Sequence, residues 1–88
     1  MSEVDLDTEF LALKEKVTQL PKRPDNNTLL ELYALFKQAT VGDVSGKRPG
    51  LLNPKGRAKF DAWTQKKGLE QQDAKQAYCA LVKRLLAG

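Results

Sequence analysis

The sequence predicts an all-α fold, and three observations support this prediction. Apolar residues recur at helical spacings along three stretches of the chain, and an N-cap residue followed by proline marks the start of a further helix at 53–54. Proline or glycine stands between these stretches, where helices commonly end. Alternating patterns are short and β-branched residues are few, so no strand is expected. Because the chain has only 88 residues, we expect one domain that spans residues 1–88.

The first predicted helix covers about residues 6–20, because an apolar stripe runs along it: Leu6, Phe10, Leu13, Val17 and Leu20. Prolines at positions 21 and 24 then end it. The second helix extends to about residue 41, where Gly42 supplies an end. Its first residue stays open among three candidate N-caps, Asn26, Asn27 and Thr28, and Thr28 could also form a capping box with Glu31.

Residues 42–53 contain three glycines and a proline, and we expect them to form a loop of the length that is usually functional. Asn53 and Pro54 suit the N-cap and first residue of a third helix, which Gly68 should end after Lys67. A fourth helix is expected from about 70 to 86, with this apolar stripe: Ala74, Ala77, Tyr78, Leu81, Val82 and Leu85. Cys79 is expected to point to a different side from that stripe as an inert thiol.

The second helix carries more apolar surface than one core neighbour requires. On a helical wheel, Leu32, Leu35 and Ala39 form one edge. The other edge carries two aromatic rings and a cation, and we interpret it as facing a ligand: Leu29, Tyr33, Phe36 and Lys37. The alternative is a central helix that is buried on most of its sides.

Lys55 and Lys59 lie one turn apart on the third helix, so their charges repel each other unless an anion lies between them. A phosphate would fill that role, and a solvated basic face is the alternative. Phe60 and Trp63 are expected to pack in the core. Tyr78 lies within an apolar stripe, so its hydroxyl needs a partner from the backbone or from a ligand.

The chain has 15 basic and 11 acidic residues, and residues 37–67 hold the basic excess, which would attract an anionic partner. Nucleic acid is one such partner, but no recognition helix is evident, so we expect no nucleic-acid binding. The sequence has no histidine, zinc-binding cysteine spacing, glycine-rich phosphate loop or nucleophile elbow. We therefore expect no catalytic residues, no metal and no cofactor.

The single cysteine favours a reducing compartment, and the acidic first ten residues resemble neither a signal nor a transit peptide. A cytoplasmic location is therefore expected. No stretch approaches the apolar length of a membrane span, so we expect no stable membrane insertion.

Four segments together resemble the acyl-CoA-binding protein family: LYALFKQATVGD at 32–43, RPG at 48–50, KGRAKFDAW at 55–63 and AYCALV at 77–82. The resemblance covers nearly the whole chain. It implies an up-down-down-up four-helix bundle that holds a fatty acyl-CoA ester in a surface bowl. It also implies a monomer that buffers and transports medium- to long-chain esters, with transient contacts to the enzymes that use them.

The resemblance places ligand contacts on six residues: Tyr33, Phe36, Lys37, Lys55, Lys59 and Tyr78. It implies that Phe36 stacks on the adenine and that Tyr33 and Lys37 meet phosphate. Lys59 would share the 3′-phosphate, while Lys55 and Tyr78 would complete the polar wall. Apolar candidates for lining the acyl chain are Leu13, Leu29 and Leu30.

The chain departs from the family pattern at four positions. Phe36 replaces a frequent tyrosine, Pro54 a frequent aromatic residue and Phe60 a frequent tryptophan. Thr18 stands where a lysine often contributes, and Lys14 lies one turn earlier. Two further alternatives are an interaction module with a decayed ligand site and an enzyme that hydrolyses the thioester.

Overall fold

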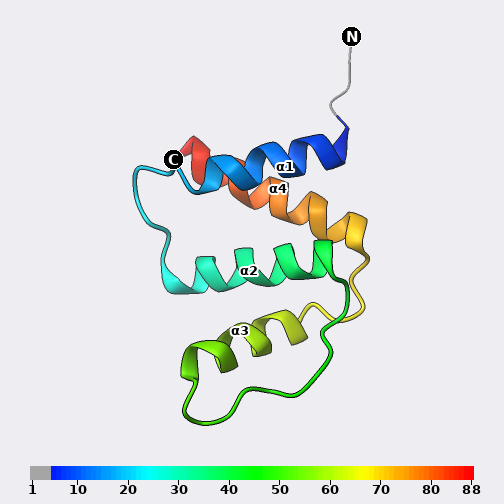
Figure 1. The fold of residues 1–88 in the computed structure, drawn as a ribbon. Coiled ribbons are helices and arrows are strands. Elements are labelled where there is room, and N and C mark those ends of the chain that lie inside the picture. The colour runs from blue at the N-terminus through cyan, green and yellow to red at the C-terminus, as the bar shows by residue number, and fades with distance from the viewer. Residues whose placement is uncertain (1–4) are drawn as a thin grey trace.

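The computed structural model describes residues 5–88, which form four α-helices and no strand (Figure 1). The helices are α1 (Leu6–Val17), α2 (Asn26–Thr40), α3 (Pro54–Thr64) and α4 (Gln71–Ala87). Helices α1 and α4 run in one direction, and α2 and α3 run in the other. The predicted all-α, up-down-down-up arrangement is therefore confirmed.

The helices lie in the spatial order α1, α4, α2, α3 (Figure 1), with α4 packed against α1 and α2, and α2 packed against α4 and α3. Because α3 lies at the outer edge and packs on α2 alone among the described helices, it has no fully buried residue. The expectation that Phe60 and Trp63 are core residues is therefore wrong, since both remain partly exposed.

The core forms where α1, α4 and α2 meet, and it contains the following buried residues: Phe10, Leu13, Leu32, Leu35, Ala39, Ala74, Tyr78, Cys79 and Val82. The predicted core edge of the second helix is confirmed by Leu32, Leu35 and Ala39. Cys79, which the sequence places off the apolar stripe, is buried as well, because α4 has a helix on each of two sides. Burial raises the pKa of the Cys79 thiol, which keeps it protonated and unreactive.

The helix ends differ from prediction in three places. Helix α2 is capped by Asp25, whose Oδ1 accepts a hydrogen bond from the Thr28 N–H at 2.7 Å, and by none of the three predicted candidates. Helices α1 and α3 end at Val17 and Thr64, earlier than predicted, because the chain continues in tighter turns with bonds from residue i+3 to residue i. The Asn53 cap is confirmed by its Oδ1, which accepts from the Gly56 N–H at 3.0 Å.

A buried amide joins α2 to α3 and to both connections that flank α3. The Gln38 side chain is 1% exposed, and its Nε2 donates to Asp43 Oδ1 and to the Leu69 carbonyl, each at 2.8 Å. Its Oε1 accepts from Trp63 Nε1 at 3.2 Å. The Gly68 N–H also donates to Asp43 Oδ1, at 2.8 Å. We call these interacting groups the Gln38 network.

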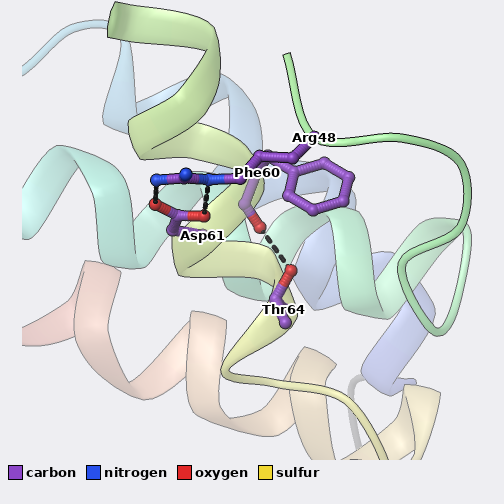
Figure 2. A network of polar contacts seen from close by, with 4 residues as sticks. All are labelled: Arg48, Phe60, Asp61 and Thr64. Carbon is purple, nitrogen blue, oxygen red and sulfur yellow. Dashed lines mark hydrogen bonds and ion pairs between the residues drawn. The ribbon is translucent and has the colours of Figure 1, made fainter. Parts of the chain in front are cut away.

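An ion pair fixes the long 41–53 connection against α3 (Figure 2). Arg48 Nε donates to Asp61 Oδ1 at 2.8 Å, and its Nη2 donates to Oδ2 at 2.7 Å. Two parallel hydrogen bonds between one guanidinium and one carboxylate fix the orientation of the two groups as well as their distance. Since both side chains are nearly half exposed, the pair contributes more to the position of the connection than to stability.

Replacing Gln38 with alanine should lower the free energy of unfolding by about 2 to 3 kcal/mol, because the buried polar groups that it joins lose partners. Urea denaturation monitored by circular dichroism measures this change. Gln76→Ala is the matched control, since Gln76 is exposed on α4 and its loss should change stability by less than about 0.5 kcal/mol. Equal effects of the two substitutions would contradict the role given to Gln38.

Asp43→Asn should weaken the pH dependence of stability at acidic pH. The Gly68 N–H, and after it the Gln38 amide, lower the pKa of Asp43 below its ordinary value of 3.8. A carboxyl whose pKa is lower in the folded state than in the unfolded state stabilises the fold at pH values above its pKa in the unfolded state. This stabilisation is lost as the pH falls through the pKa of the folded state. Denaturation midpoints measured from pH 6 down to pH 2 should therefore fall less steeply for the variant than for the parent, and parallel curves would exclude this role.

Candidate ligand-binding site

A groove lies between α2 and α3. These helices are neighbours and run in the same direction, so both begin at the same end of the groove (Figure 1). The groove encloses about 410 Å³ and is lined by Arg23, Asn26, Leu29, Leu30, Tyr33, Pro54, Lys55, Ala58 and Lys59. It therefore brings together five of the residues predicted from the sequence, namely Leu29, Leu30, Tyr33, Lys55 and Lys59.

Cations and aromatic rings alternate across the two helices. Lys59 Nζ on α3 lies 5.3 Å from the ring centre of Tyr33 on α2. One turn further along, Lys37 Nζ on α2 lies 5.1 Å from the ring centre of Trp63 on α3. Both contacts fall within the range of a cation–π interaction. Tyr33, Lys37 and Lys59 therefore belong to one continuous surface.

Three of these cations have no carboxylate partner among residues 5–88. The ion pairs there engage Arg48, Lys66, Lys75 and Lys83, and leave Lys37, Lys55 and Lys59 free to meet another anion. The first turns of α2 and α3 lie at one end of the groove and add the positive ends of two helix dipoles. The electrostatics of the groove therefore favour an anionic ligand such as a phosphate.

Phe36 and Tyr78 lie in a second group, on the side of α2 that faces α1 and α4. The Phe36 ring stacks on Phe10 with centres 5.8 Å apart, and Tyr78 meets Phe10 edge to face at 5.1 Å. Lys14 Nζ lies 5.8 Å from the Phe36 ring centre. Because Phe10 covers one face of Phe36, an adenine that stacks on this ring has to use the opposite face.

The Tyr78 hydroxyl is a hydrogen-bond donor at neutral pH. Burial raises the pKa of Tyr78, and the residue is only 4% exposed. This hydroxyl forms no hydrogen bond within residues 5–88, and since no fully buried side-chain polar atom there lacks a partner, its oxygen is accessible at the surface. A bound polar group could take that place.

Leu13 does not join Leu29 and Leu30. It is buried in the core, on the far side of α2 from the groove. Conversely, the groove includes Arg23, which sequence reasoning did not select. Arg23 precedes the α2 cap, and only the parallel arrangement of α2 and α3 places it beside Lys55, so the sequence pattern gave little sign of it.

A second hollow of about 550 Å³ lies between the α1–α2 connection and the C-terminal end of α4. It contains none of the residues predicted to bind ligand. Within residues 5–88, no group of three or more potential ligands is placed to hold a metal ion. None of the helices in that part of the chain is long and apolar enough to cross a bilayer.

Comparisons with known proteins give one consistent result. A family model described as "Acyl CoA binding protein" matches residues 7–82. An acyl-CoA-binding protein homolog from Manduca sexta is 51% identical, with 96% of this chain and 94% of the relative aligned. The acyl-CoA-binding protein of Saccharomyces cerevisiae is 52% identical over 81% of this chain and 82% of its own. The crystal structure of acyl-CoA-binding protein 2 from Oryza sativa superposes with a TM-score of 0.90, at 43% identity, over 94% of this chain and 92% of that one.

Proposed function

This chain belongs to the acyl-CoA-binding protein family, and from that premise we propose that it holds fatty acyl-CoA esters non-covalently in the groove between α2 and α3. The observation that carries the proposal is that Lys55, Lys59 and the Tyr33 ring line the same groove as Leu29 and Leu30. Neither of these lysines, nor the adjacent Lys37, has an ion-pair partner within residues 5–88. One wall thus suits phosphate and a base, and the adjoining wall suits hydrocarbon.

At the nucleotide end, Lys37 and Lys59 share the 3′-phosphate, and Tyr33 lies next to them. Lys55 completes the polar wall of the groove. Phe36 and the Tyr78 hydroxyl lie on the neighbouring side of α2, so an ester whose adenine stacks on Phe36 extends over α2 beyond the groove. The support for this assignment is that Lys37 and Lys59 each lie over an aromatic ring and that none of the three lysines forms an ion pair within residues 5–88.

At the acyl end, Leu29 and Leu30 cover part of the chain. Burying about fourteen methylenes at roughly 0.8 kcal/mol each offers on the order of 11 kcal/mol before the costs of association. Since the groove is open, only part of this gain is realised. The acyl chain therefore supplies much of the affinity, and the cations supply orientation.

We further propose a carrier rather than a catalyst: a cytoplasmic monomer that buffers and transports medium- to long-chain esters and contacts acyl-CoA-using enzymes transiently. The groove is lined by cations, leucines, a tyrosine, an asparagine, a proline and an alanine, and this set contains no base that could activate a nucleophile. Incubation with palmitoyl-CoA and a thiol reagent separates the two roles, because an enzyme would release free CoA with time.

Affinity should rise with acyl length, because each added methylene can be buried in the groove. Isothermal titration calorimetry with free CoA, octanoyl-CoA and palmitoyl-CoA measures the trend. We expect palmitoyl-CoA to bind at least about a hundredfold more tightly than free CoA. Equal affinities for palmitoyl-CoA and free CoA would refute the apolar wall, and no binding of any of the three would indicate a decayed site.

Lys59→Met should weaken palmitoyl-CoA binding by about tenfold or more, through loss of a charge-assisted contact to the 3′-phosphate. Palmitoyl-3′-dephospho-CoA should bind the parent and the variant equally, because it lacks the group that Lys59 contacts. Lys16→Met is the matched control: Lys16 is exposed on α1, and its loss changes the net charge by the same amount. If the variant discriminates against the dephospho ester as strongly as the parent does, Lys59 contacts some other part of the ligand.

A further inference from the structure

Two consecutive leucines project from the 41–53 connection into solvent. Leu51 is 83% exposed and Leu52 101%, the highest values among the large apolar residues of 5–88. They occupy the two corners of a turn closed by the Asn53 N–H, which donates to the Gly50 carbonyl at 3.0 Å. Corners of this kind usually carry glycine, proline or polar residues, so two adjacent leucines are unusual. We call residues 50–53 the leucine turn.

The surroundings of the leucine turn are basic. Residues 44–60 contain five cations and no acidic residue: Lys47, Arg48, Lys55, Arg57 and Lys59. Arg48 is taken by Asp61, whereas the exposed Lys47 and Lys55 flank the turn without an ion-pair partner among residues 5–88. An apolar tip between unpaired cations is complementary to an anionic lipid bilayer, whose interior is apolar and whose headgroup layer is negatively charged.

The leucine turn is held in place before any contact is made. The Arg48–Asp61 pair (Figure 2) holds the chain on α3 just before the turn. The Asn53 cap fixes the other end of the turn to the first turn of α3. Little ordering is then required when the leucines bind. The turn is also continuous with the groove, since Pro54 and Lys55 follow it directly and line the groove.

We propose that the leucine turn is a membrane-docking element, with Leu51 and Leu52 inserted at the surface of an anionic lipid bilayer and with Lys47 and Lys55 on the headgroups. A second copy of this chain is a poorer partner, because self-association through this surface would bring the same cations together. Two leucines give a reversible contact and no stable insertion. The docking proposal does not depend on ester binding. If the groove does bind acyl-CoA esters, as proposed above, docking would bring it to the membrane surface, into which these esters partition.

Cosedimentation of the full, ligand-free chain with vesicles tests the proposal. One set of vesicles is phosphatidylcholine alone, and the other contains roughly one quarter phosphatidylserine. We expect binding to the anionic set that weakens as salt rises, and a loss of about tenfold in affinity for Leu51→Gln/Leu52→Gln. The matched control is Leu11→Gln/Leu86→Gln, which removes two exposed leucines from α1 and α4 and should bind as the parent does.

Three outcomes would overturn the proposal: no vesicle binding by the parent chain, equal binding by the parent and the leucine-turn variant, or equal losses in both double variants. Dimerisation that the leucine-turn variant abolishes, without vesicle binding, would assign the leucines to a second copy instead. Calorimetry with palmitoyl-CoA keeps the two proposals apart. The leucine-turn variant should retain the affinity of the parent for this ester, and a chain that binds vesicles but no ester would refute only the proposed function.

Discussion

The placement of α3 depends on the hydrogen bonds of the Gln38 side-chain amide. Helix α3 lies at the edge of the bundle, buries no residue fully and, among the described helices, packs only on α2, so apolar contacts hold it weakly. The amide compensates, because a single buried group binds the connection before α3, a side chain within α3 and the connection after it. Because the buried Gln38 amide is hydrogen-bonded through both its nitrogen and its oxygen, it holds α3 in place against α2 and so fixes the width of the groove between them.

The parallel course of α2 and α3 explains both the long connection and the basic groove. A chain that leaves the end of α2 must return along its full length before α3 can begin beside the first turn of α2. Fifteen residues of helix are about 22 Å long, a distance that a short turn cannot span. The same geometry brings two helix N-termini and the residues around them to one end of the groove, where Arg23 and Lys55 add charge to the helix dipoles.

The local features of the sequence predicted the four helices: apolar stripes located the first, second and fourth, and Asn53, Pro54 and Gly68 marked the third. The up-down-down-up arrangement did not follow from these features and came only from the family resemblance. Burial depended on how many neighbours each helix has, which the sequence pattern did not reveal. Cys79 is buried because α4 is covered on two sides, whereas the prediction of Phe60 and Trp63 as core residues failed because α3 has one neighbour among the described helices. Tyr33, Lys55 and Lys59 line one groove, while their role in binding ligand stays a prediction. Leu13 lies outside this groove, and periodicity alone could not show this, since it marks an apolar residue without saying which side of a bundle it lies on.

The position of Trp63 makes the protein its own optical reporter. It is the only tryptophan of the chain, its indole N–H is bonded at 2.9 Å to the Gly42 carbonyl, and an ammonium group lies over its ring. A charge close to an indole shifts the energy of its excited state. If Lys37 moves from this ring to the phosphate of a bound ester, as proposed, the emission of Trp63 should change, so occupancy could be followed without a label.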